Sequence, residues 1–78
     1  MNNLELKTKE ILLSVRPDLD FNEGVNYVEN GDFDSFDIIT IVTELDSKFG
    51  IKISGLDVSP ENFINIISIV NLVRKYIK

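Results

Sequence analysis

Apolar residues in the middle of the chain recur with the period of an α-helix. From position 38 to 49 they fall at i, i+3, i+4, i+7 and i+11, which places them on one helix face: Ile38, Ile41, Val42, Leu45 and Phe49. The other faces would carry Phe36, Thr40, Thr43, Ser47 and the carboxylates of Asp37 and Asp46. We therefore predict a helix from about Ser35 to Phe49, with the first set in the core and the second set directed outward.

Both ends of this helix carry boundary signals. Asp34 is a favourable N-cap residue, and Asp37 places a second carboxylate on the first turn, three residues later. Gly50 is suited to end the helix in the left-handed conformation. Ser35 would then lie just inside the helix with its hydroxyl turned to solvent. Because the helix is rich in β-branched residues, we expect tertiary packing to hold it.

A second stripe of the same period lies near the N-terminus and consists of Leu4, Ile11, Leu12 and Val15. Asn2 or Asn3 is placed to cap this helix. Pro17 should end it near Val15, because the residue before a proline disfavours the helical conformation.

Two further helix starts follow in the last third of the chain. Ser59 as N-cap and Pro60 at the first helical position predict a short helix through Phe63 or Ile64. Asn65 then caps a last helix. Its apolar stripe consists of Ile66, Ile69, Val70, Val73 and Ile77, widened by Leu72 and Tyr76.

The connections between these helices also contain apolar residues. Residues 17 to 33 form a long loop that we expect to pack on the helices through Leu19, Phe21, Val25, Tyr27 and Val28. Ile51 and Ile53 alternate with polar residues, but no second strand candidate exists, so we expect an extended loop with Ile53 in the core. The 78 residues predict a single all-α domain over 1–78, with three long helices, one short helix and a long first loop.

The composition removes several kinds of chemistry. There is no cysteine, and therefore no disulfide, thiolate metal site or thiol nucleophile. There is also no histidine, the commonest general base and transition-metal ligand. A nucleophilic serine needs an adjacent base of this kind, so Ser35 is not expected to be catalytic. We expect no enzymatic activity and no metal site.

The start of the chain has neither the basic nor the apolar region of a secretory leader. No stretch approaches the about 20 apolar residues that a membrane span requires. We therefore expect a soluble, cytoplasmic protein without membrane insertion.

Acidic residues are concentrated around Ser35. The net charge is −5, and residues 17 to 46 hold nine acidic side chains and no basic one, whereas residues 47 to 78 hold five basic and two acidic ones. The negative electrostatic field of the acidic segment argues against binding to nucleic acid or anionic lipid. It favours steered encounters with basic protein surfaces. The simpler interpretation, that acidic loops keep a small protein soluble, stays open.

A calcium-binding pattern overlaps the first loop. Positions 1, 3, 5, 8 and 12 of an EF-hand loop are matched by Asp18, Asp20, Asn22, Val25 and Glu29. The sharp turn of an EF-hand needs glycine at position 6, where this chain has Glu23, and Gly24 follows one residue late. Weak, adventitious binding of divalent ions is therefore favoured over an EF-hand.

The residues around Ser35 resemble the attachment site of acyl and peptidyl carrier proteins. Asp34-Ser35-Phe36 is similar to the Asp-Ser-Leu motif of that family, which accepts Leu, Met or Phe at the third position. The resemblance covers essentially the whole chain in one register, through Arg16-Pro17-Asp18, Gly31, Asp37, Leu45, Phe49-Gly50, Ile53 and the run from Ile69 to Ile77. It implies the four-helix bundle of a carrier protein.

The resemblance also implies a covalent cofactor on Ser35. A phosphopantetheinyl transferase would move 4′-phosphopantetheine from coenzyme A to this serine. A cargo-loading ligase or acyltransferase and downstream synthase enzymes would then use the terminal thiol to carry cargo as a thioester. The protein itself would be a monomer with an acidic docking face on the central helix. Residues that we expect to take part in partner recognition are Asp34, Phe36, Asp37, Thr40 and Asp46; Phe36 either anchors a partner or folds back onto the loop.

Departures from the family pattern bear on the cargo. Thr40, Ser47 and Lys48 stand where fatty-acid carriers have acidic residues, and the segment 56–63 is more similar to D-alanyl or stand-alone peptidyl carriers. This favours aminoacyl or specialised acyl cargo over fatty-acid synthesis, with polyketide pathways open. Residues that would line a cargo site serve equally well as ordinary core: Ile38, Leu45, Ile53, Val58 and Ile64. The alternatives are an unmodified acidic helical interaction module and, with less support, a calcium-binding loop protein.

Overall fold

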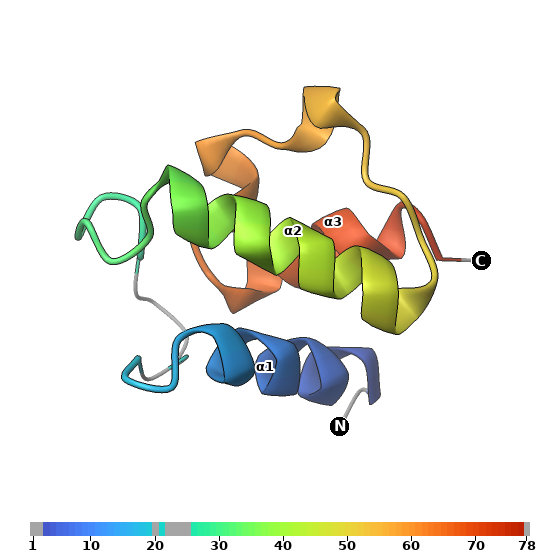
Figure 1. Ribbon diagram of the computed structural model, residues 1–78, viewed down its shortest axis with the longest axis horizontal. Coiled ribbons are helices and arrows are strands. Elements are labelled where there is room, and N and C mark those ends of the chain that lie inside the picture. The colour runs from blue at the N-terminus through green and yellow to red at the C-terminus, as the bar shows by residue number, and fades with distance from the viewer. Residues whose placement is uncertain (1–2, 20, 22–25, 78) are drawn as a thin grey trace.

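The helices of the protein pack around one another in a computed structural model that describes residues 3–19, 21 and 26–77. Three α-helices are present, α1 (Asn3–Val15), α2 (Ser35–Phe49) and α3 (Ile66–Arg74), with two 3-10 helices, η1 (Gly55–Asp57) and η2 (Pro60–Phe63). In Figure 1, α1 lies below α2, and α3 is seen behind α2. α1 packs against α2 and α3, and α3 packs against η2. The described part of the chain contains no strand, so the expected all-α class is confirmed.

The predicted central helix is confirmed at both ends. α2 begins at Ser35 after the N-cap Asp34, and it ends at Phe49 before Gly50. Gly50 adopts the left-handed conformation with φ of 63°, which a glycine tolerates without steric cost. α1 ends at Val15 as predicted, but Asn3 is its first helical residue and so is not its cap. Asn2 lies outside the described residues.

The short helix predicted after Ser59 is present as the 3-10 helix η2 (Pro60–Phe63). The last third of the chain differs from the prediction in two ways. A second 3-10 helix, η1, precedes η2 where the sequence carries no helical period. α3 has nine residues and ends at Arg74, so the prediction of a long last helix reaching Ile77 is wrong. Ile77 is exposed and lies outside the core.

The early end of α3 coincides with long-range contacts of Tyr76. Its hydroxyl donates a hydrogen bond to Asp57 Oδ2 and accepts one from the backbone N–H of Ser54 at 3.0 Å. Lys75 Nζ lies 3.7 Å from Asp57 Oδ1. The chain leaves the α-helix where its side chains contact η1. Lys75 N–H donates to Leu72 and Tyr76 N–H to Val73 in the 3-10 pattern, and Ile77 N–H also donates to Val73.

The core draws on every α-helix and on the first loop. Its buried apolar residues are Ile11, Leu12, Phe21, Tyr27, Phe33, Ile38, Ile41, Leu45, Ile53, Phe63, Ile66, Ile69, Val70, Leu72 and Val73. The expected burial of Ile53 from an extended segment is thus confirmed. Thr8 is also fully buried, which the apolar pattern did not predict, and its hydroxyl donates to the carbonyl of Leu4 at 2.7 Å. This intrahelical bond satisfies the hydroxyl inside the core.

The first loop packs on the helices through three aromatic rings. Tyr27, Phe21 and Phe33 contact one another, with ring centroids 5.1 Å (Phe21–Tyr27), 5.2 Å (Tyr27–Phe33) and 6.1 Å (Phe21–Phe33) apart. The backbone N–H of Tyr27 donates to the carbonyl of Ile64 at 2.8 Å, which fastens the loop to the segment before α3. The prediction of a packed loop is therefore confirmed where the loop is described; Val25 lies outside the described residues.

We expect replacement of Tyr76 by Phe to lower thermal stability by a few degrees at neutral pH. The hydrogen bond to Asp57 raises the pKa of Tyr76 above its ordinary value. A raised pKa means that the folded state holds the phenol proton more tightly than the unfolded state. The stabilisation is therefore fully present below about pH 10 and is lost as the pH rises through the folded pKa.

The measurement is an absorbance titration of the two tyrosines, with thermal melts across the same pH range. Tyr76→Phe should remove one tyrosine titration that lies above the ordinary pKa, and it should flatten the alkaline loss of stability. A parent protein in which Tyr76 titrates at its ordinary pKa would contradict the assigned bond.

Candidate functional site

The candidate site is the N-terminal turn of α2, where Ser35 is the first helical residue. Ser35 is exposed, and its hydroxyl has no hydrogen-bond partner among the described residues. The first backbone N–H groups of a helix lack intrahelical acceptors, and the helix dipole places partial positive charge there. A group attached to this oxygen would therefore project into solvent, and an anionic group would be electrostatically favoured.

A reciprocal capping box fixes the conformation of this turn. The carboxylate of Asp34 accepts from the backbone N–H of Asp37 at 2.8 Å, and the carboxylate of Asp37 accepts from the N–H of Asp34 at 3.3 Å. The two carboxylates thus satisfy two backbone donors on either side of Ser35. The predicted capping by Asp34 is confirmed.

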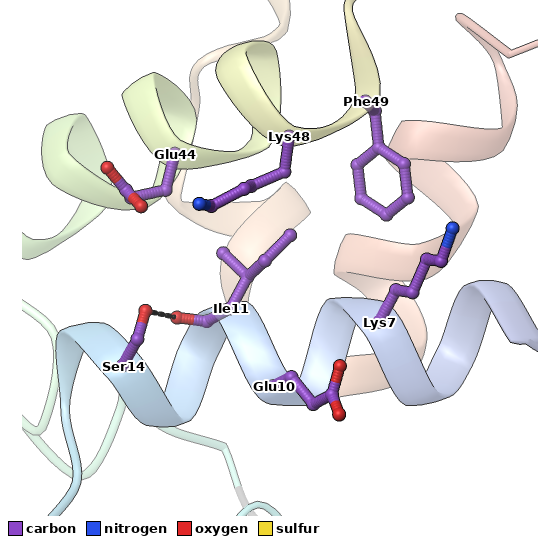
Figure 2. Close-up of a pocket in the computed structure, with 7 residues that line it drawn as sticks. All are labelled: Lys7, Glu10, Ile11, Ser14, Glu44, Lys48 and Phe49. Carbon is purple, nitrogen blue, oxygen red and sulfur yellow. Dashed lines mark hydrogen bonds between the residues drawn. The ribbon is translucent and has the colours of Figure 1, made fainter.

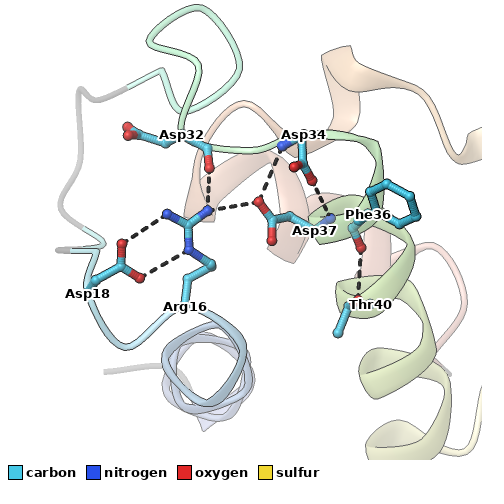
Figure 3. Close-up of polar contacts among 7 residues, drawn as sticks. All are labelled: Arg16, Asp18, Asp32, Asp34, Phe36, Asp37 and Thr40. Carbon is cyan, nitrogen blue, oxygen red and sulfur yellow. Dashed lines mark hydrogen bonds and ion pairs between the residues drawn. The ribbon is translucent and has the colours of Figure 1, made fainter.

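Arg16 holds the same turn from the end of α1, as Figure 3 shows. Its Nη1 donates to Asp37 Oδ2 at 2.8 Å and to the backbone carbonyl of Asp32. Its Nε and Nη2 donate to the two carboxylate oxygens of Asp18, at 3.0 and 2.9 Å. One guanidinium therefore joins the end of α1, the first loop and the start of α2, in the bidentate geometry that arginine permits.

These contacts shift the protonation equilibria at the site. The hydrogen bond from Arg16 holds the pKa of Asp18 below its usual range, and the bond to Asp18 in turn raises the pKa of Arg16. Both groups thus stay charged through the neutral range.

Three of the expected recognition residues are exposed: Asp34, Phe36 and Thr40. Phe36 is 79% exposed, so it does not fold back onto the loop. Thr40 is exposed as well, although its hydroxyl donates to the carbonyl of Phe36 at 2.8 Å within the helix. Asp34 is exposed, and its carboxylate serves in the cap.

The outward placement predicted for Asp37 and Asp46 is wrong. The side chain of Asp37 is 21% exposed because it pairs with Arg16. Asp46 is half-buried, and its Oδ1 accepts from the backbone N–H of Ile53 at 3.0 Å. Both carboxylates are held by groups outside α2, the guanidinium of Arg16 and the backbone N–H of Ile53. The helical period of the sequence does not reveal such contacts. The outward face of α2 around Ser35 is consequently less acidic than we expected.

A small apolar cavity of about 240 Å³ adjoins Ser35. It is lined by Ser35, Ile38, Ile39, Val58 and Pro60. Of the residues predicted to line a cargo site, Ile38 and Val58 are present here. Leu45 and Ile53 lie in the core instead, and Ile64 is half-buried outside the lining.

A larger cavity of about 400 Å³ lies between α1 and α2, as shown in Figure 2. Its floor is apolar, with Ile11 and Phe49, and its rim carries charges of both signs. The rim residues are Lys7, Glu10, Ser14, Glu44 and Lys48. Ser35 is absent from its lining, and the sequence pattern gave no signal for this cavity.

The described residues offer little to a metal ion. Asp18 is engaged by Arg16, and Glu29 accepts from Asn26 Nδ2 at 2.8 Å. Asp20, Asn22 and Val25 of the EF-hand pattern lie outside the described residues. Within 3–19, 21 and 26–77, no group of three or more acidic side chains is placed to hold a metal.

No family model matches the chain, and no curated protein or solved structure matches it. Of the helices in the described ranges, none has the length and apolar character to cross a membrane.

Replacement of Asp34 by Ala should destabilise the protein by about 1 kcal/mol, because α2 loses its N-cap. The measurement is the free energy of unfolding from urea denaturation. Asp34→Asn is the matched control, since asparagine caps equally well without the charge. If the two variants were equally destabilised, the charge of Asp34 and not the cap would be the stabilising feature.

Replacement of Arg16 by Gln should lower the melting temperature at pH 7. The further fall of the melting temperature as the pH is lowered should be smaller in the variant than in the parent. The depressed pKa of Asp18 means that its stabilisation is present above about pH 4 and is lost as the pH falls through the folded pKa. Carboxyl NMR titration should show the pKa of Asp18 rising toward its usual value in the variant.

Arg74→Gln removes the same charge from an exposed position and is the control. An unchanged Asp18 titration in Arg16→Gln, or an equal effect of Arg74→Gln, would show that Arg16 does not bind Asp18 in solution.

Proposed function

We propose that this protein is an acyl or aminoacyl carrier whose cargo is held as a thioester on 4′-phosphopantetheine attached to Ser35. The observation that carries the proposal is the placement of this serine. Its hydroxyl is exposed and unpartnered among the described residues, at the first position of a capped helix. A transferase can approach such an oxygen without unfolding the chain.

The local electrostatics support a phosphodiester at this position. The linkage would lie beside the first N–H groups of α2, where the helix dipole favours an anion. Of the nearest acidic groups, the carboxylate of Asp37 pairs with Arg16, while that of Asp34 caps the helix by accepting a backbone N–H. The added negative charge therefore meets less repulsion than the sequence alone indicates.

The rigidity of the attachment point also supports the proposal. A carrier supplies no chemistry of its own and has to present a flexible arm from a fixed base. The capping box and the Arg16 contacts immobilise the turn that holds Ser35, while the serine itself stays free. We propose that the fold is the four-helix carrier bundle, with η2 as its short third helix.

The proposed partners are a phosphopantetheinyl transferase, a cargo-loading ligase or acyltransferase, and the synthases that collect the cargo, all acting on a cytoplasmic monomer. For cargo we favour aminoacyl or specialised acyl groups. The engagement of Asp37 and Asp46 within the protein supports this choice, because it leaves fewer free carboxylates along α2 than the sequence indicates.

An unmodified interaction module is the second candidate, and the exposure of Leu56 and Phe36 favours it. Exposed apolar side chains serve any protein partner, with or without a modified serine. The two functions differ in whether Ser35 accepts a covalent group.

We expect incubation with coenzyme A and a broad-specificity phosphopantetheinyl transferase to add one phosphopantetheinyl group, measured by intact mass. Ser35→Ala should gain none, because it lacks the accepting oxygen. Ser47→Ala, which removes an exposed serine from the same helix, should be modified like the parent.

If the folded parent gained no mass, the carrier function would be rejected and the interaction module favoured. Equal modification of the parent and Ser35→Ala would place the acceptor elsewhere.

A further inference from the structure

We infer that the groove between α1 and α2 binds a small zwitterion, in which an apolar chain separates a carboxylate from an ammonium group. The groove is the cavity of about 400 Å³ shown in Figure 2. This volume lies in the range of small-molecule sites, which combine an apolar lining with a few charged or polar groups. The inference is independent of the proposed function, because it concerns a different part of the molecule.

The floor of the groove is apolar. Ile11 of α1 belongs to the buried core, and Phe49 is half-buried and packs against that core at the end of α2. The packing of the two helices therefore holds both side chains in place. An apolar chain lying on them would be removed from water, which favours binding.

The two ends of the groove carry opposite charges. In Figure 2, Lys7 and Phe49 lie at one end of the groove. Glu44 and Ser14 lie at the other end, and Ile11 lies between the two pairs. The ammonium of Lys7 would attract a carboxylate, and the carboxylate of Glu44 would attract an ammonium group.

Neither of these charges is compensated within the described part of the chain. Lys7 and Glu44 make no ion pair and no side-chain hydrogen bond there. Glu44 is half-buried, so water reaches it less freely than it reaches a fully exposed carboxylate. An ammonium group beside Glu44 would therefore compensate a charge that water solvates incompletely.

The remaining rim charges, Lys48 and Glu10, are exposed and of opposite sign. Glu10 extends away from α2 in Figure 2. Lys48 lies one turn after Glu44 on α2, but the two do not form an ion pair. The rim charges therefore sum to zero, and a ligand with only one kind of charge would leave the other sign unmatched. Charge complementarity thus favours a zwitterion over a phosphate or a fatty acid anion.

The length of the groove sets the separation of the two ligand charges. From Lys7 to Ser14, α1 rises by about 10 Å. With bonds of about 1.5 Å, an extended six-carbon chain with a charge at each end is of similar length. Ser35 lies about 20 Å from Lys48 along α2, so the groove is separate from the candidate attachment site.

The test is an NMR titration of the protein with three probes of equal chain length: ε-aminocaproate, caproate and hexylammonium. We expect the backbone amide signals of Ile11 and Phe49 to shift at millimolar concentrations of ε-aminocaproate, because the site is small and open. This zwitterion should bind about three- to fivefold more tightly than either singly charged probe, since an exposed ion pair contributes modestly.

Two variants assign the charges to the two ends. Lys7→Gln should weaken the binding of ε-aminocaproate by about threefold and leave that of hexylammonium unchanged. Glu44→Gln should weaken ε-aminocaproate by a similar factor and leave caproate unchanged. Lys52→Gln removes an exposed positive charge outside the groove lining and is the control. It should bind the three probes like the parent, and circular dichroism would show that each variant is folded.

Equal affinities for the three probes would overturn the inference. Tighter binding of caproate than of ε-aminocaproate would overturn it as well, because the two lysines would then form an anion site. The absence of saturable shifts in the groove would also contradict it. Ser35→Ala should bind ε-aminocaproate like the parent, so the outcome does not depend on modification of that serine.

Discussion

The guanidinium of Arg16 joins three segments that the chain would otherwise leave separate. It binds the carboxylate of Asp18 just after α1, the carbonyl of Asp32 at the end of the first loop and the carboxylate of Asp37 in the first turn of α2. Asp37 is also one half of the box that caps α2. Arg16 therefore adds a polar clamp to the apolar packing of Phe33 and Ile38 that positions Ser35, because a small core alone would hold that turn less firmly.

Local signals allowed most of the fold to be predicted from the sequence. Asp34, Gly50 and Asn65 mark their helix boundaries correctly because capping depends on neighbouring residues. The end of α3 was mispredicted because Tyr76 bonds Ser54 and Asp57, about twenty positions away in sequence. Asp37 and Asp46 were misplaced for the same reason: their partners, Arg16 and Ile53, come from other segments.

The site combines a fixed helical turn with an exposed serine hydroxyl. Caps and a clamp immobilise the backbone on both sides of Ser35, while its hydroxyl remains exposed. Asp18 and Asp37 pair with Arg16, while Asp34 stays exposed beside Phe36, which is 79% exposed. The proposed carrier would thus present its arm from a rigid turn.

The most direct test of this account is the mass of the protein isolated from the cells that produce it. Fragmentation of the peptide that contains Ser35 would locate any covalent group. The account predicts that a substantial fraction carries one phosphopantetheinyl group, attached at Ser35 and released by phosphodiester cleavage. A folded protein recovered wholly unmodified, from cells with an active phosphopantetheinyl transferase, would contradict it.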